Sequence, residues 1–381
     1  MSFDAPSPIE ERNALIARAR RAWIDGDAMA APERVEPWLT RSWQRCLAAG
    51  RRPQQRVVFD AVSAPSMRRA TERSAQLLQV ARPVLDRLSR AIVDTRYFAI
   101  LTDADGIVID IGAQPDAADL HAHAIARIGL DLSERAVGTT AIGAALAEQA
   151  PVWLHRGEHF FDDTSVYTCA GAPLIDPHGR CIGMLDLTGV NVLERPALRQ
   201  LAQHSAHAIE DALVRAQPCA LLLQLNWPGC LGEPGAGAGT DGDGLLCLDA
   251  DGRVMGANAA ARQLLQLPPS AGPAASLPCT DLFAVPAAML FDAGRRHPAA
   301  IEVPLWSGLR MHVRATRSAR PTPVAAATPA TAPVSTLRDM ESALIRHAVE
   351  EARGNVAQAA RALGISRATM YRKLGRGHKP T

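Results

Sequence analysis

The segment CAGAPLIDPHGRCIGMLDLTGV, Cys169–Val190, predicts the structure of the middle of this chain. Two runs of apolar and small residues flank the letters DPHG at 176–179, which are typical of a tight turn between paired strands. An earlier segment, YFAILTDADGIVIDIG from Tyr97, has the same arrangement around DADG. The two segments therefore predict two β-hairpins.

The region between the hairpins has a different period. The letters SERAVGTTAIGAALAEQAPVWLH, from Ser133, predict a loop, a helix of small residues at Ala141–Leu146 and a strand at Val152–His155. After the second hairpin, apolar residues recur at helical spacing from Leu198 to Leu213, which predicts a long amphipathic helix. A sheet with helices against one face and a polar-lined hollow on the other fits a small-molecule sensor.

These segments also carry a family resemblance. The letters SERAVGTTAIGAALAEQAPVWLHRGEHF and CAGAPLIDPHGRCIGMLDLTG resemble the GAF sensor domain of the acetoin-catabolism regulators. The letters RSWQRCLAAG at residues 41–50 resemble the N-terminal segment of the same family. The resemblance covers about the first 215 residues and implies a small-molecule effector.

We expect the effector to contact polar and aromatic side chains around the mouth of the hollow. Trp153 and Cys169 are equally compatible with an apolar core, and Asp186 with the cap of a turn. No motif commits the chain to haem, flavin or a metal ion, so we expect no cofactor. The candidate effector-binding residues are Trp153, His155, His159, Tyr167, Cys169 and Asp186.

Apolar residues also recur at helical spacing from Met67 to Ile92, where we expect a helix that leads into the sensor and forms a dimer contact. Pro83 is expected to kink or divide this helix. Further on, GLLCLDADGRVMGANAAARQLL predicts two strands and a helix that begins at Asn258, and AIEVPLWSGLRMHVRAT predicts a closing hairpin. This region is similar to a short PAS domain, and we favour a structural spacer over an intact ligand pocket.

The segment RPTPVAAATPATAPVST, residues 320–336, has four prolines and no hydrophobic period, so it predicts an extended linker. From Leu337 a long helix is predicted, followed by a second from Asn355 and a third from Ser366. A small residue at Ala360 and the stop at Gly364 suit the close approach and tight turn of a helix-turn-helix. The net charge of the chain is only +2, but no acidic residue follows Arg353, so the basic excess is local.

The letters GNVAQAARALGISRATMYRKLGR resemble the Fis-type helix-turn-helix of bacterial sigma-54 enhancer-binding regulators. The resemblance implies a homodimer whose third helices enter successive major grooves of double-stranded DNA. A solvated basic hairpin that packs on the rest of the protein is the structural alternative. The candidate DNA-binding residues are Ser366, Arg367, Ala368, Thr369, Tyr371, Arg372, Lys373 and Arg376.

The resembled regulators usually carry an ATPase domain between the PAS-like part and the helix-turn-helix. That domain needs a G-x-x-x-x-G-K-[ST] phosphate loop, and no such motif occurs in the 381 residues. We therefore expect no ATP hydrolysis and no direct remodelling of sigma-54. RNA polymerase or relatives that carry the motor are possible partners of a regulator that acts by occupancy or recruitment.

A different class of function is suggested by HRGEH, His155–His159, which fits the H-x-x-E-H pattern of inverted zinc peptidases. A strand that ends at His155 and a glycine in the middle disagree with the helix which that chemistry needs. The seven cysteines show no C-x-x-C spacing, and no apolar run approaches the roughly 20 residues of a membrane helix. We expect a cytoplasmic, nucleoid-associated protein that is not an enzyme and has no membrane role.

These patterns predict a multidomain α+β protein in five parts. They are an N-terminal helical segment (1–66), a GAF sensor with flanking helices (67–216), a degenerate PAS-like domain (217–318), an Ala/Pro-rich linker (319–336) and an all-α Fis-type helix-turn-helix (337–381). The function favoured is a ligand-responsive, sequence-specific transcription regulator. The alternatives are a ligand-blind architectural DNA-binding protein and a zinc hydrolase built on HRGEH.

Overall fold

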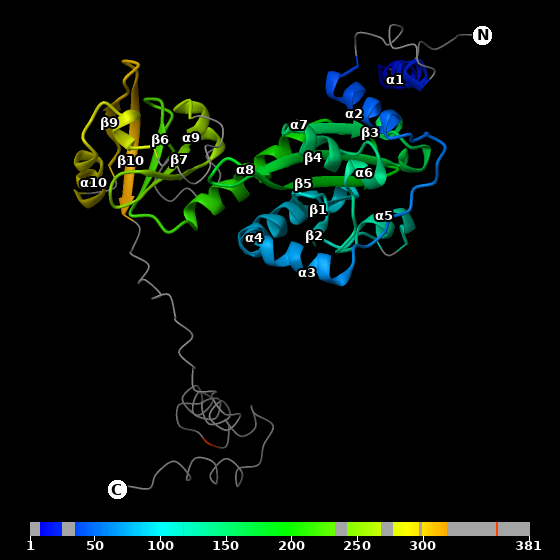
Figure 1. The fold of residues 1–381 in the computed structure, drawn as a ribbon, viewed down its shortest axis with the longest axis horizontal. Coiled ribbons are helices and arrows are strands. Elements are labelled where there is room, and N and C mark those ends of the chain that lie inside the picture. The colour runs from blue at the N-terminus through cyan, green and yellow to red at the C-terminus, as the bar shows by residue number, and fades with distance from the viewer. Residues whose placement is uncertain are drawn as a thin grey trace. The chain divides into compact units, whose positions relative to one another are not determined.

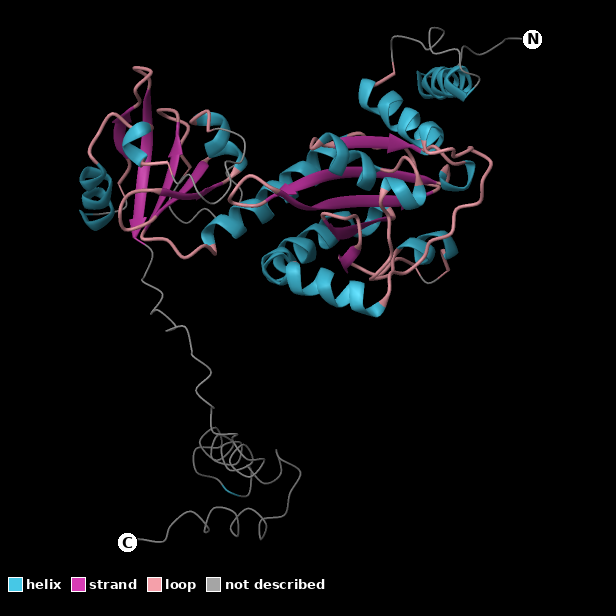
Figure 2. Ribbon diagram, in the orientation of Figure 1, coloured by secondary structure: helices cyan, strands magenta, loops and turns pink. Residues whose placement is uncertain are grey.

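The computed structural model describes residues 8–24, 35–116, 118–232, 242–267, 277–296 and 299–317, together with Val356. These residues form an α+β structure with two five-stranded sheets, both antiparallel throughout (Figure 1; Figure 2). The predicted linker at 319–336 and, apart from Val356, the predicted helix-turn-helix at 337–381 lie outside the described residues.

The first sheet confirms both predicted hairpins. Its strands are β1 (Tyr97–Asp103), β2 (Val108–Ile111), β3 (Val152–His155), β4 (Tyr167–Ile175) and β5 (Cys181–Val190), in the order β2-β1-β5-β4-β3. Turn chemistry explains the hairpins, because each turn begins with an aspartate whose carboxylate accepts hydrogen bonds from later backbone N–H groups. Asp103 accepts from Asp105 and Ile107, and Asp176 accepts from His178 and Arg180.

Helices cover both faces of this sheet (Figure 1). Side chains alternate between the faces along each strand, so every strand contributes to two apolar clusters. One face packs against α4 (Ala75–Ile92) and α8 (Ala197–Arg215). The other face packs against α5 (Leu120–Ile125), α6 (Glu134–Val137) and α7 (Ala141–Glu148), all from the region between the hairpins.

The N-terminal helices α1 (Pro8–Ile24) and α2 (Pro37–Ala48) pack on the first sheet's domain rather than apart from it. Trp43 of α2 is buried and its indole N–H donates to the backbone oxygen of Glu158 at 2.9 Å. The short helices η3 (Arg156–Glu158) and η4 (Asp162–Thr164) flank Phe160 and Phe161, which join the same apolar cluster.

The predicted helix from Met67 to Ile92 is divided, but not at the proline. The structure has α3 (Ala64–Arg73) and then α4, with the break at Ser74, and α4 continues past Pro83. Because proline has no N–H, the carbonyl of Gln79, four residues earlier, loses its helical hydrogen bond. Pro83 and Gln79 are both exposed, so water can bond this carbonyl instead. The expected division at Pro83 is therefore wrong. A short helix, η2 (Val93–Thr95), ends the segment.

The second sheet has a central strand that the sequence patterns did not predict. Its strands are β6 (Leu221–Asn226), β7 (Gly244–Leu248), β8 (Val254–Ala257), β9 (Ile301–Pro304) and β10 (Arg310–Arg317), in the order β8-β7-β6-β10-β9. Helices α9 (Ala259–Leu264) and α10 (Ala287–Arg296) pack on it, and η5 (Cys279–Asp281) lies between them in sequence. The predicted helix start at Asn258 is confirmed, since its side chain accepts from the backbone N–H of Ala261.

None of the helices in the described ranges is long and apolar enough to span a bilayer.

Candidate functional site

A small cavity lies under the first sheet, on the face covered by α5, α6 and α7. The space open to the centres of water molecules is about 30 Å³, which is enough for about two waters. Most of its wall is apolar, and its polar groups come from β4, β5 and the η3–η4 region. The lining residues are Phe59, Ile100, Ile125, Leu132, Val137, Thr140, Ala141, Ile142, His159, Thr164, Tyr167, Cys169, Asp186 and Thr188.

Asp186 is the central polar group of this cavity. It comes from β5, the middle strand of the sheet, and is completely buried. The hydroxyl of Thr188 donates to its Oδ2, while Oδ1 has no hydrogen-bond partner in the part of the chain that the structure describes. Burial raises the pKa of Asp186 to about 7. A buried carboxylate oxygen without a donor is costly, so the cavity presents a strong acceptor to any molecule that enters.

His159 and Cys169 form a second polar pair in the wall. The Nδ1 of His159 lies 2.9 Å from the carbonyl oxygen of Arg156, which can only accept, so Nδ1 carries the proton. Burial lowers the pKa of His159 to about 4, so the ring is neutral at pH 7 and its Nε2 is an acceptor. That nitrogen faces the Cys169 Sγ at 3.7 Å, and burial raises the thiol pKa well above its ordinary value.

The structure brings four of the six candidate effector residues together. His159, Tyr167, Cys169 and Asp186 line the cavity, and the Tyr167 hydroxyl donates to the backbone oxygen of His121 at 3.1 Å. Burial raises the pKa of the Tyr167 phenol, so it too is uncharged at neutral pH. At pH 7 the only side chain of the cavity that is close to its titration point is Asp186.

The other two candidates lie on the opposite face of the sheet. The register pairs Leu154 with Cys169, so the neighbours of Leu154 in β3 point away from the cavity. Trp153 packs in the cluster of α4 and α8, where its indole N–H donates to Glu194 at 3.3 Å. His155 pairs its Nδ1 with the Thr168 hydroxyl at 2.8 Å.

Among the polar and aromatic side chains of the cavity wall, the sequence patterns missed Phe59, Thr140, Thr164 and Thr188. Thr140 had a signal, because a threonine just before a helix of small residues is a typical N-cap, and its hydroxyl accepts from Gly143 at 3.2 Å. Phe59 and Thr164 come from irregular segments whose position only the tertiary structure gives. Phe59 packs edge-on against Tyr167, with ring centroids 6.2 Å apart.

The HRGEH segment does not have the geometry of a zinc peptidase. His155 and His159 flank the η3 turn, and their imidazoles bond to Thr168 and to the Arg156 carbonyl. The carboxylate of Glu158 forms an ion pair with Arg12 of α1 at 2.6 Å and accepts from the backbone N–H of His155. Within the described residues no group of three or more His, Cys, Asp or Glu side chains could hold a metal ion.

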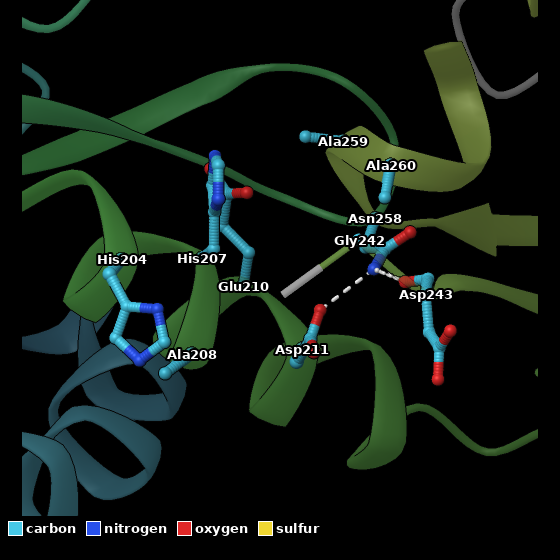
Figure 3. Close-up of a pocket in the computed structure, with 10 residues that line it drawn as sticks. All are labelled: His204, His207, Ala208, Glu210, Asp211, Gly242, Asp243, Asn258, Ala259 and Ala260. Carbon is cyan, nitrogen blue, oxygen red and sulfur yellow. Dashed lines mark hydrogen bonds between the residues drawn. The ribbon is translucent and has the colours of Figure 1, made fainter. Parts of the chain in front are cut away.

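A second hollow lies where α8 meets the start of α9 (Figure 3). Asn258 donates from Nδ2 to the Asp211 carboxylate at 2.7 Å and to the backbone oxygen of Asp243 at 2.9 Å. Glu210 is buried, accepts from the backbone N–H of Ile175 at 2.8 Å, and has no partner for Oε2 among the described residues. Burial raises the pKa of Glu210 to about 8. This hollow contains none of the candidate effector residues.

The candidate DNA-binding residues, Ser366, Arg367, Ala368, Thr369, Tyr371, Arg372, Lys373 and Arg376, lie outside the described residues, so their arrangement stays a prediction.

The fold and the cavity define an α+β protein in which a small, mainly apolar hollow with a buried aspartate lies against the first sheet. The C-terminal residues 336–377 match the family described as bacterial regulatory protein, Fis family. Residues 13–211, more than half of the chain, match the family described as MimR, N-terminal domain, and the chain belongs to that family. The predicted relation to the acetoin-type, sigma-54-related regulators with a Fis-type helix-turn-helix is thereby confirmed.

Two curated relatives illustrate this family. The acetoin catabolism regulatory protein of Cupriavidus necator is 30% identical over 236 residues, which are 60% of this chain and 34% of that protein. The propane 2-monooxygenase operon transcriptional activator MimR of Mycolicibacterium goodii is 31% identical over 198 residues, 51% of this chain and 33% of that protein. The aligned part of this chain thus spans about a third of the length of these relatives.

Among solved structures, the crystal structure of the E. coli DhaR(N)–DhaL complex is similar, with a TM-score of 0.45 and 14% sequence identity. The similarity covers 74% of this chain and 100% of the compared chain.

Proposed function

We propose that this protein is a ligand-responsive, sequence-specific transcription regulator that senses a small molecule in the cavity of the first sheet and binds DNA through residues 337–381. The observation that carries the sensing part is the unpartnered, fully buried Oδ1 of Asp186 inside that cavity. The Fis-family match over residues 336–377 supports the DNA-binding part. The first sheet's domain acts as the GAF-type sensor, and the second sheet's domain as a PAS-like spacer.

The effector is a small uncharged molecule that carries a hydroxyl group. His159, Tyr167 and Cys169 are neutral at pH 7, so an anionic ligand would lose its hydration without gaining a cationic partner. A hydroxyl can donate to Asp186 Oδ1, and a carbonyl on the same molecule can accept from the hydroxyl of Thr140, which itself accepts from the backbone N–H of Gly143. The names of the relatives mention acetoin catabolism and a propane 2-monooxygenase operon, and acetoin is a small uncharged molecule with a hydroxyl and a carbonyl. The cavity would widen to admit it, because the space present holds about two waters.

Regulation proceeds without an ATP-driven step in this chain, because its sequence has no phosphate loop. The protein acts by occupancy or recruitment as a homodimer, with RNA polymerase or motor-bearing relatives as further partners. Effector binding changes the dimer geometry at the sensor helices, and the changed geometry alters the affinity for DNA.

Effector binding is tested by calorimetry on the full chain. Acetoin, butane-2,3-diol and propan-2-ol are the uncharged probes, and acetate and pyruvate are the charged controls. We expect binding of at least one uncharged probe, weakened about tenfold or more by Asp186→Leu, and no binding of the anions. A matched control is Asp116→Asn, an exposed carboxylate. Failure of every probe, or equal affinity in Asp186→Leu, would contradict this effector chemistry.

DNA recognition is tested by genome-wide occupancy in the host. The intact protein should give discrete peaks that share a near-palindrome, and an Arg367→Ala, Arg372→Ala variant should lose them because these side chains read base edges. Lys373→Ala should weaken binding about equally on all sequences and reduce its salt dependence. Discrete peaks that persist without any effector response would favour the ligand-blind architectural function.

A further inference from the structure

A basic groove lies between α1 and the η3–η4 segment, outside the first sheet and apart from the cavity. The groove has a volume of about 500 Å³, which is typical of small-molecule sites. Its lining combines apolar side chains with three arginines and one carboxylate. The lining residues are Ile16, Ala17, Arg20, Arg21, Ile24, Pro53, Gln54, Arg156, Gly157 and Asp162.

The arginines of this groove have unused donors. Arg20 donates from Nη2 to Asp162 at 2.8 Å and to the backbone oxygen of Phe160, but its buried Nε has no partner among the described residues. Arg21 donates from Nε only to the carbonyl of Ala17 in its own helix. The exposed guanidinium of Arg156 makes no hydrogen bond or ion pair with any residue that the structure describes.

The backbone at Arg156 is also unusual. Its φ is +47°, a left-handed conformation that a residue with a side chain adopts only at a cost. Arg156 lines the groove together with Arg20 and Arg21 of α1.

We propose that this groove binds a small organic anion, an oxyanion head on a short apolar body. The head would take the fork-shaped donors of Arg156, which match the oxygens of a carboxylate or a phosphate ester, with Arg21 also in the lining of the groove. The body would cover Ile16, Ile24 and Pro53. The single carboxylate, Asp162, is already paired with Arg20 and leaves the groove with an excess of positive charge.

The groove is linked to the cavity through η3, because the carbonyl of Arg156 holds both the backbone N–H and the Nδ1 of His159. An anion that moves Arg156 would therefore act on a wall of the cavity. The anion site itself does not rest on the proposed effector, so anion binding by an effector-blind protein would still support it.

The test is calorimetry on the full chain with inorganic phosphate, butyl phosphate, hexanoate and, as an uncharged control, butan-1-ol. We expect butyl phosphate or hexanoate to bind at least tenfold more tightly than inorganic phosphate, and butan-1-ol not to bind. A preference for butyl phosphate would assign a phosphate ester, and a preference for hexanoate a carboxylate. Equal affinity for inorganic phosphate and both organic anions would overturn the apolar part of the site.

The variants separate binding from folding. Arg156→Gly removes the guanidinium and relieves the left-handed backbone, so we expect an equal or higher Tm together with a loss of affinity of about tenfold or more. Arg199→Gln removes an exposed charge of α8 and should leave the affinity unchanged. Unchanged affinity in Arg156→Gly, an equal loss in Arg199→Gln, or no binding of any anion at millimolar concentration would overturn the proposal.

Discussion

The two sheets of this chain have the same spatial arrangement but take their central strand from opposite ends of their domains. In the first sheet β5 is the last strand in sequence and lies between β1 and β4. In the second sheet β6 is the first strand and lies between β7 and β10. On one side of each central strand lies a hairpin, β1–β2 in the first sheet and β7–β8 in the second, and on the other side lie two further antiparallel strands, β4–β3 and β10–β9.

The central strands differ in what they place against the helices on one face of each sheet. On this face β5 carries Asp186 and Thr188, which line the cavity with their polar groups. On the corresponding face β6 carries Leu221, Leu223 and Leu225, which pack in the cluster of α9 and α10. The order of strands is therefore compatible with either a polar hollow or an apolar core, and the side chains of the central strand distinguish them.

The largest change in stability is expected when the central strand of the second sheet receives a buried carboxylate like that of Asp186. Leu223→Asp would put a carboxylate at a completely buried position, paired in register with Leu246 and Ala315. We expect the free energy of unfolding to fall by about 4 kcal/mol or more, measured by urea denaturation. Leu309→Asp, at a position that is 53% exposed, is the control and should change little. If Leu223→Asp left the free energy of unfolding unchanged, the proposed difference between the central strands of the two sheets would be wrong.

In the first sheet we expect a substitution of the buried carboxylate to increase the free energy of unfolding, the opposite of the effect in the second sheet. The folded pKa of Asp186 is about 7, above its unfolded value, so folding favours the protonated form and stability is lost as pH rises from about 4 through 7. Asp186→Asn removes this loss and should raise the free energy of unfolding by about 3 kcal/mol at pH 8, with little change at pH 4. The measurement is urea denaturation at both pH values. The same difference at pH 4 and pH 8 would contradict the ionisation argument.

An effect of the same sign is expected at the second hollow (Figure 3). Glu210 has a folded pKa of about 8, so the stability that its protonated form contributes is lost as pH rises from about 4.5 through 8. Glu210→Gln should therefore raise the free energy of unfolding at pH 9 by about 3 kcal/mol, and its amide oxygen can still accept from the backbone N–H of Ile175. In the double variant with Asp186→Asn the two gains should add, since the groups share no partner. If Glu210→Gln raised the free energy of unfolding by the same amount at pH 4.5, ionisation of Glu210 would not be the cause.

Much of the first sheet could be predicted because its signals are local. The turns at DADG and DPHG flank apolar strands, and the region between them changes to a helical period. The strand β6 was missed because LLLQLN is a short apolar run after a long helix, and such a run has no period that identifies a strand. Pro83 was expected to kink or divide the helix because proline lacks the backbone N–H, but α4 continues past it and the break lies at Ser74.

The candidate site was predictable in residue type but not in orientation. Trp153 and His155 alternate with Leu154, and one of the two sets must face the helices α5–α7. The pairing of Leu154 with Cys169 settles which set does so, and no property of β3 by itself contains that information. Phe59 and Thr164 reach the cavity from segments that are distant in sequence.

The sequence by itself determined the two hairpins, the helices between and after them, and the relation to the MimR and Fis families, because turn residues, hydrophobic periods and motifs act over short distances along the chain. The tertiary structure alone decided which face of β3 and β5 meets the cavity, that β6 is a central strand, and that no described residue donates to the Asp186 Oδ1. These features depend on strand register and on the burial of groups from separate segments, which exist only after the chain has packed.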